Sequence, residues 1–352
     1  MAAADPTGAP RTPVSRLGVA IMAGLLAVVL AVGIWRNGVL QALGDLGFRS
    51  PPIAVYTILL LSPLFFESAY PALARRTSGR PRRVVENLHR HAPYLIVIGI
   101  VMLVMRLENA LDLSLTSAMG LDFTPAIWRF EGDLVGPLQS WMRGWPLNDV
   151  TVPLYGKPLG DSIFIFVYVT LYALYHVLAI FGFAVAGRTG MVKRLAVAWT
   201  LIYAVALPFY LFLPVNEVWT TNLDHCPQYG YTEVEGILNT DCGDSGGVVL
   251  AIASINNCMP SLHNAFAWTL PLVLLRSGWR RLGWSVSLFG ALITVSTVYL
   301  GIHWLVDIVA GLALAWVATT VAVRLDYGLS HRLRLTGLRW RRPGESPSPD
   351  SA

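Results

Sequence analysis

The chain has 352 residues, of which 55% are hydrophobic and only 13% are charged. A soluble domain carries about 25% charged residues, so the composition excludes an ordinary soluble enzyme and indicates a polytopic membrane protein. The net charge of +5 is explained by basic loops that hold one membrane face, and it gives no indication of a nucleic-acid partner.

Apolar stretches that cross a bilayer core of about 30 Å predict the fold class, an all-α integral membrane protein. We expect a membrane domain at 17–325, between a disordered cytoplasmic tail at 1–16 and a basic, Pro/Ser-rich cytoplasmic tail at 326–352. In chain order, the eight predicted transmembrane helices are 17–35, 53–74, 93–113, 162–186, 195–213, 262–275, 282–300 and 303–323.

The distribution of basic residues supports this threading. Of the 26 Lys and Arg residues, 20 fall in five segments that eight crossings place on the same side, namely 1–16, 75–91, 187–194, 276–281 and 324–342. Because such segments stay in the cytoplasm, we expect both termini there. The long segments 114–161 and 214–257 are then outside, and the cell membrane is the expected location.

The first long outer segment contains a predicted helix. Thr124 and Pro125 are favoured at a helix start, and apolar residues recur at spacings of three and four from 127 to 141. This pattern predicts an interfacial helix on the outer side, interrupted at Pro137. Such a helix is either a lid that only seals the bundle or a lid that contacts a substrate.

Two histidines belong to longer motifs. His263 ends the segment Cys-Met-Pro-Ser-Leu-His, and His303 lies four residues before Asp307. Residues at this spacing share a helical face, where the carboxylate can accept from one ring nitrogen and leave the other nitrogen to attack. Gly311 and Ala315 continue that face and are expected to let another helix approach closely.

The start of the sixth span suits an anion. Pro260 and Ser261 are expected to open this helix, with the serine satisfying a free amide. Exposed amides and the positive end of the helix dipole favour an anionic ligand.

The other histidines and the cysteines do not belong to a motif that predicts chemistry. We expect His176, in the fourth span, to be a satisfied interior histidine, and the remaining four to be solvated, namely His89, His91, His225 and His331. The cysteines lie in one outer segment, which permits one disulfide and one thiol. Buried free cysteines are the alternative, and the pairing is open among Cys226, Cys242 and Cys258.

The pattern Pro-Ser-x-His followed by Ser-x6-His-x3-Asp resembles the type 2 phosphatidic acid phosphatase superfamily. Its forms here, C-M-P-S-L-H and S-T-V-Y-L-G-I-H-W-L-V-D, look most like the inositol phosphorylceramide synthase branch. The segment Phe-Leu-Pro-Val-Asn-Glu at 212–217 is similar to a Phe-Pro-Val segment of that branch. The resemblance covers about 160–325 and implies a six-helix catalytic core there.

The resemblance also implies a two-step phosphoryl transfer at the outer face, with no metal and no other cofactor. His303 would be the nucleophile and form a phosphohistidine, and Asp307 would orient it. His263 would protonate the leaving group and then activate the acceptor. Ser261 and Ser296 would help to bind the phosphate.

Two departures from the superfamily concern the phosphate. The phosphatases carry a Lys-x6-Arg-Pro motif that is absent here, and an Arg at the position of Thr297. Both groups would hold a dianionic monoester through charge-assisted hydrogen bonds. Four cations on the outer side are possible substitutes, with the first two taken as substrate-binding residues: Lys157, Arg129, Arg143 and Arg106.

These departures favour transfer of a phospho-head group from a lipid phosphate or phosphodiester to an alcohol or water. The alternatives are an inositol phosphorylceramide synthase-like head-group transferase specifically, or a polyprenyl or phosphatidate phosphatase. A transporter or inactive scaffold is the non-enzyme alternative, although a transporter is expected to show internal repeats and none is visible. Membrane lipids are the expected partners.

Overall fold

The structure is a computed structural model that describes residues 13–45, 69–143, 163–217, 257–299 and 302–335, together with 58, 61 and 62. Residues 69–76 are helical, and one bridge joins Val215 to Asn257, with no strand in these ranges. The long helices are α1 (Pro13–Asp45), α3 (Gly79–Met119), α4 (Thr124–Arg143), a π-helix η1 (Phe166–Leu171) that continues as α6 (Tyr172–Val185), α7 (Thr189–Phe212), α8 (Leu262–Arg276), α9 (Arg280–Tyr299) and α10 (Leu305–Leu335).

The predicted class, an all-α integral membrane protein, is confirmed. Among the described residues, five helical segments are long and apolar enough to cross a membrane: Gly79–Asn109, Ile163–Val185, Thr189–Phe212, Arg280–Tyr299 and Leu305–Asp326. The predicted total of eight spans stays a prediction, because the span at 53–74 lies mostly outside the described residues.

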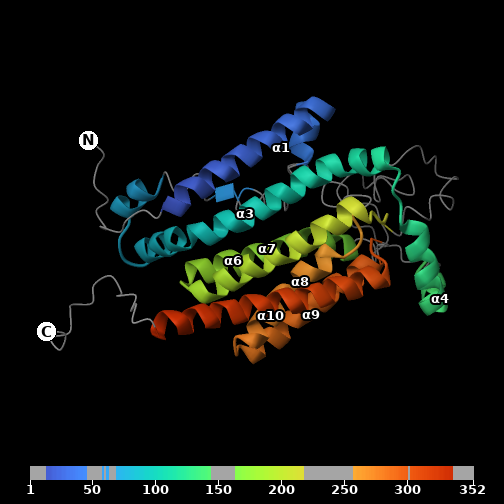
Figure 1. The fold of residues 1–352 in the computed structure, drawn as a ribbon. Coiled ribbons are helices and arrows are strands. Elements are labelled where there is room, and N and C mark those ends of the chain that lie inside the picture. The colour runs from blue at the N-terminus through green and yellow to red at the C-terminus, as the bar shows by residue number, and fades with distance from the viewer. Residues whose placement is uncertain are drawn as a thin grey trace.

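The helices form an elongated bundle in which α7, α8 and α10 lie side by side (Figure 1). The largest apolar cluster joins these helices to α3 and α6, with Trp199, Ile202 and Phe266 buried within it. A smaller cluster packs α1 on α3 through Met22 and Ile96. Because lipid is as apolar as these side chains, close van der Waals packing holds such helices together.

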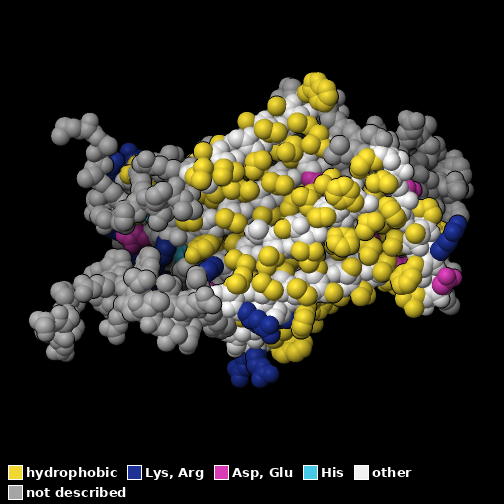
Figure 2. All heavy atoms as spheres, in the orientation of Figure 1, with side chains coloured by type: hydrophobic (Ala, Val, Ile, Leu, Met, Phe, Trp, Pro, Cys, Tyr) yellow, Lys and Arg dark blue, Asp and Glu magenta, His cyan; other side chains and the backbone are white. Residues whose placement is uncertain are grey.

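The bundle has one basic end. The turns between α6 and α7 and between α8 and α9 lie at that end, and so does the C-terminal end of α10 (Figure 1). There Asp326 on α10 pairs with Lys193 and Arg194 of α7, both at 2.9 Å. Figure 2 shows a broad hydrophobic surface over the middle of the bundle, with basic side chains toward this end and on α4.

One predicted solvated histidine is wrong. Helix α3 begins at Gly79, well before the predicted span, so His91 lies on a packed helix rather than in a loop. The side chain of His91 is fully buried and contacts the Asn87 carbonyl oxygen at 2.6 Å and the Thr189 hydroxyl at 2.9 Å. His89 on the same helix stacks on Tyr70, with ring centroids 3.7 Å apart.

A helix, α4, is present where the sequence predicts an interfacial helix, and it begins at Thr124 as expected. The backbone N–H of Thr124 donates to the Asp122 carboxylate at 2.8 Å, which fixes the start. The predicted interruption at Pro137 is wrong, because α4 continues through this position. The carbonyl that loses its intrahelical partner there belongs to Asp133, an exposed residue that water can reach.

Candidate active site

The two predicted histidines meet at the end of the bundle opposite the basic end. His263 lies in the first turn of α8, and His303 lies in the bend before α10. The Nδ1 atom of His263 is 3.1 Å from the Nε2 atom of His303. His263 is partly exposed, whereas His303 is 2% exposed, so the histidine pair has one accessible member.

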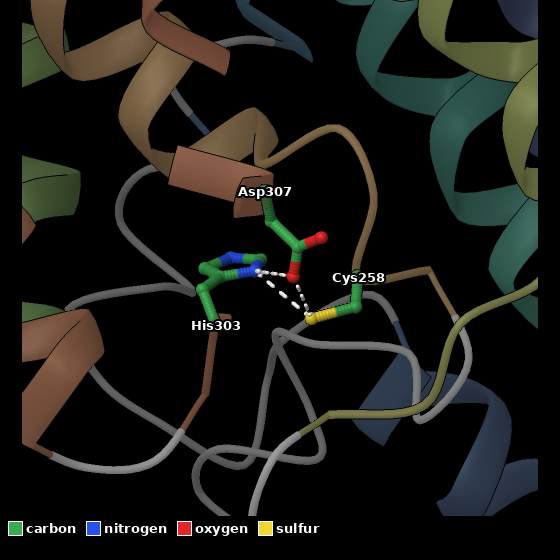
Figure 3. Close-up of side chains that lie close together, drawn as sticks. All are labelled: Cys258, His303 and Asp307. Atoms are coloured by element: carbon green, nitrogen blue, oxygen red, sulfur yellow. Dashed lines mark hydrogen bonds and ion pairs between the residues drawn. The ribbon is translucent and has the colours of Figure 1, made fainter. Parts of the chain in front are cut away.

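Asp307 does not bond His303 directly. Helix α10 begins at Leu305, so the expected common helical face does not exist, and the His303 Nδ1 atom is 3.9 Å from Asp307 Oδ2. This distance is within ion-pair range but too long for a hydrogen bond. Figure 3 shows the thiol of Cys258 beside both groups. Its Sγ atom is 2.8 Å from Asp307 Oδ2 and 3.2 Å from His303 Nδ1.

These contacts define one order of donors and acceptors when Asp307 is ionised and both rings are neutral. An ionised carboxylate only accepts, so the Cys258 thiol donates to Asp307 and accepts from the Nδ1–H of His303. The Nε2 atom of His303 then carries a lone pair and accepts from the Nδ1–H of His263. His263 Nε2 in turn accepts from the hydroxyl of Tyr168 at 2.8 Å. The chain leaves the His303 Nε2 lone pair facing the accessible histidine.

Burial keeps both inner groups uncharged. Desolvation lowers the pKa of His303 to about 3, so the ring is neutral near pH 7 and its lone pair is available. Desolvation, followed by the charge of Asp307, raises the pKa of the Cys258 thiol well above its usual range. Cys258 is therefore a protonated donor, and the structure describes it as a free, buried cysteine.

The start of α8 confirms the predicted role of Ser261 as its N-cap. The Ser261 hydroxyl oxygen accepts from the backbone N–H of Asn264 at 3.3 Å and from its side-chain amide at 2.9 Å. The same amide donates to Thr297 Oγ1 at 3.1 Å. Thr297 is fully buried in this network, so the position where the phosphatases carry Arg holds a structural hydroxyl here.

Gly311 permits the close helix approach that the sequence predicts. A Cβ atom at this position would overlap the carbonyl oxygen of Ser261. The backbone N–H of Ser261 also donates to the carbonyl oxygen of Asp307 at 3.1 Å. The missing side chain therefore lets α10 bring Asp307 against the segment that carries Cys258 and His263.

The π-helix η1 presents a residue that sequence reasoning missed. Tyr168 is fully buried at its centre and bonds His263. A π-turn inserts one extra residue and so changes which side chains face the bundle, and such turns often mark functional sites. The sequence Phe-Val-Tyr-Val-Thr-Leu gives no signal of this turn, because an ordinary apolar helix has the same pattern.

Helix α4 covers the start of α10. The carboxylate of Glu131, 2% exposed, accepts from the backbone N–H of Val306 at 3.1 Å. Trp128 packs edge-on against Trp304 with centroids 5.7 Å apart. The indole N–H of Trp304 donates to the Asn216 carbonyl oxygen at 2.9 Å. Both α4 and the Phe-Pro-Val segment thus hold the bend that carries His303.

The other residues predicted to bind the substrate lie in different surroundings. Ser296 is buried and its hydroxyl donates to the Ile293 carbonyl oxygen within α9 at 2.7 Å. Arg129 is exposed on α4. Arg106 on α3 lies within electrostatic range of His263. Lys157 and the side chain of Arg143 lie outside the described residues.

Cys258, His303 and Asp307 also offer ligand types that zinc uses, with their atoms within 4.8 Å of one another. A tetrahedral ion with bonds of ~2.0–2.3 Å separates adjacent sulfur and oxygen ligands by about 3.5 Å. The observed Sγ–Oδ2 distance is 2.8 Å. The spacing fits a hydrogen bond better than a bound ion.

The fold and the site together define a class: an all-α membrane protein with a histidine pair and a buried carboxylate at one end of the bundle. Residues 138–321 match the PAP2 superfamily. Because this match covers more than half of the chain, the protein belongs to that superfamily, and the motif resemblance is confirmed at the level of the superfamily. No curated protein and no solved structure matches the chain.

Proposed function

We propose that the protein transfers a phospho-head group from a membrane lipid to an alcohol or to water through a phosphohistidine. Membership of the PAP2 superfamily supports a lipid phosphatase-type activity. The observation that carries the finer proposal is the 3.1 Å contact between His263 Nδ1 and His303 Nε2. Once a substrate lies between the rings, the lone pair of His303 can reach its phosphorus atom, and His263 can exchange a proton with an oxygen bonded to that phosphorus.

In the first step, the His303 Nε2 lone pair attacks phosphorus and the bond from phosphorus to the lipid oxygen breaks. His263, protonated beside the anionic phosphate, gives its proton to that oxygen. In the second step, His263 takes the proton of the acceptor hydroxyl, whose oxygen bonds phosphorus as the P–N bond breaks. The Cys258 thiol and Asp307 stabilise the positive charge that His303 carries in the intermediate.

Of the candidate cations whose side chains the structure describes, Arg106 is the best supported for phosphate binding, since it lies within electrostatic range of His263. The buried hydroxyl of Thr297 supplies no charge at the position where the phosphatases have Arg. The loss of this Arg suits a phosphodiester, which carries one negative charge, better than a dianionic monoester. This favours head-group transfer, and the inositol phosphorylceramide synthase-like reaction is its most specific form.

We also infer that the histidine end faces outside the cell membrane and that both termini are cytoplasmic. The support is the basic end of the bundle, because Lys and Arg segments are retained in the cytoplasm. An impermeant thiol or amine reagent applied to intact cells is expected to spare single reporter residues placed at the basic turns. Labelling of those reporters before lysis would show that the orientation is the reverse of the one inferred.

The function is tested with the purified full-length chain and a lipid phosphodiester donor that is radiolabelled in its phospho-head group. Adding a ceramide or diacylglycerol acceptor is expected to move label into a new lipid, whereas water alone releases a free head-group phosphate. Release of phosphate from a phosphatidate or polyprenyl phosphate donor would instead support the alternative, a phosphatase that acts on monoesters.

His303→Ala should abolish turnover and the acid-labile covalent label together. Turnover that survives this substitution would exclude the phosphohistidine. An inactive scaffold or transporter would show no turnover with any donor.

A further inference from the structure

A second feature of the bundle is an apolar groove that runs from the neighbourhood of Tyr172 to the basic end. It lies between α6, α8 and α9 and has a volume of about 520 Å³. Its ends are marked by Leu171, the last residue of η1, and by Ala186, which follows α6, about 22 Å apart at 1.5 Å per residue. One leaflet of the hydrocarbon core is about 15 Å deep, so the groove is long enough to hold a lipid chain.

A glycine leaves open space in the wall of the groove. Gly182 lines it, and a Cβ atom added there would meet nothing within 4 Å. The neighbouring wall is made of long apolar side chains, including Leu178, which is 64% exposed, and Phe289, which is 40% exposed. A side chain at Gly182 would therefore enter the groove without displacing other atoms.

One end of the groove is cationic. Arg188 lines this end, and its guanidinium lies over the ring of Trp279 at 5.3 Å from the centroid. The exposed Arg280 and Arg281 follow Trp279 at the start of α9. No Asp or Glu is among the lining residues. An aromatic ring and guanidinium groups at a helix end suit a lipid phosphate at the membrane surface.

We propose that this groove is a binding site for one anionic phospholipid of the leaflet at the basic end. One acyl chain lies along Gly182, and the phosphate is held by Arg188 beside Trp279. The cationic rim is at the end of the bundle opposite His263 and His303, so the phosphate held there is distinct from the phosphate that reacts at the histidines. The positive rim selects an anionic head group over a zwitterionic one.

The site is tested by native mass spectrometry of the purified full-length chain, titrated with phosphatidylglycerol and with phosphatidylcholine of the same acyl chains. We expect the first phosphatidylglycerol to bind about ten-fold more tightly than phosphatidylcholine, because only its net charge complements the rim. Gly182→Leu should remove this tight site. Gly24→Leu is the matched control, since a Cβ at Gly24 on α1 also meets nothing within 4 Å, and it should change nothing.

Arg188→Ala should abolish the preference for phosphatidylglycerol, and Arg188→Lys should restore part of it. Equal binding of the two lipids by the unmodified chain would overturn the proposal, as would unchanged binding in Gly182→Leu. If Gly182→Leu instead raises only the KM for a long-chain substrate, the groove holds the substrate's tail and the proposal is wrong. The binding measurement does not involve turnover, so its failure leaves the proposed reaction untouched.

Discussion

Replacing Cys258 tests whether Asp307 acts on His303 through the Cys258 thiol or by direct contact. The thiol donates to Asp307 at 2.8 Å and contacts His303 at 3.2 Å, whereas the ring and the carboxylate are 3.9 Å apart. Cys258→Ala removes a hydrogen bond to a charged group, worth about 1.5–3 kcal/mol. If that energy is needed in the transition state, kcat falls roughly 10- to 150-fold.

Cys258→Ser is the matched variant, because a hydroxyl also donates and accepts and should keep kcat within a few-fold of the unmodified chain. The KM is expected to be unchanged in both variants, since Cys258 is behind His303 and does not face the substrate. Rapid quenching should show slower formation of the covalent label in Cys258→Ala. The bridge would be refuted by full activity of Cys258→Ala, which would mean that Asp307 closes directly onto His303, or by an equal loss in both variants.

Three further substitutions test the surroundings of the site. Tyr168→Phe removes the hydroxyl that bonds His263 at 2.8 Å, so kcat should fall roughly ten-fold and the pH profile of kcat should shift. Thermal stability should be unchanged, and an unmoved pH profile would contradict this role of Tyr168. Gly311→Ala forces a methyl group against the Ser261 carbonyl and should lower both activity and melting temperature. Gly24→Ala, where a Cβ meets nothing within 4 Å, should lower neither. Glu131→Ala leaves the part-buried Val306 N–H without its acceptor, a loss of at most about 1–3 kcal/mol, whereas Glu131→Gln retains an acceptor oxygen. Limited proteolysis should therefore cut α4 faster in Glu131→Ala than in Glu131→Gln.

Local periodicity and motif spacing were sufficient to predict the helix start and the close helix approach around the two histidines. The expected start of the sixth span, the N-cap at Ser261 and the close approach at Gly311 are all present. Each depends on neighbours within one helix or on a single small residue, so the sequence carries the information directly. The convergence of His263, His303 and Asp307 followed from placing both motifs on one membrane face.

The details that were wrong or missed depend on contacts between distant segments. Cys258 reaches Asp307 across 49 positions, and the π-turn that aims Tyr168 at His263 leaves no periodic signal. Pro137 does not end α4, because water can satisfy a carbonyl on an exposed helix. His91 is buried because α3 extends toward the turn between α6 and α7, where Asn87 donates to the Val185 carbonyl oxygen at 2.9 Å.

The contact of α3 with the segment before Cys258 limits how the protein can be divided. Glu108 accepts from the side-chain amide of Asn257 at 2.7 Å, and Asn257 is the residue that precedes Cys258. Together with Glu131 on α4, this means that two carboxylates from outside the superfamily match support the residues within it. A chain shortened to 160–325 would retain both histidine motifs but lose these supports. Chimeras that exchange head-group preference between relatives should therefore carry α3 and α4 along with the C-terminal half.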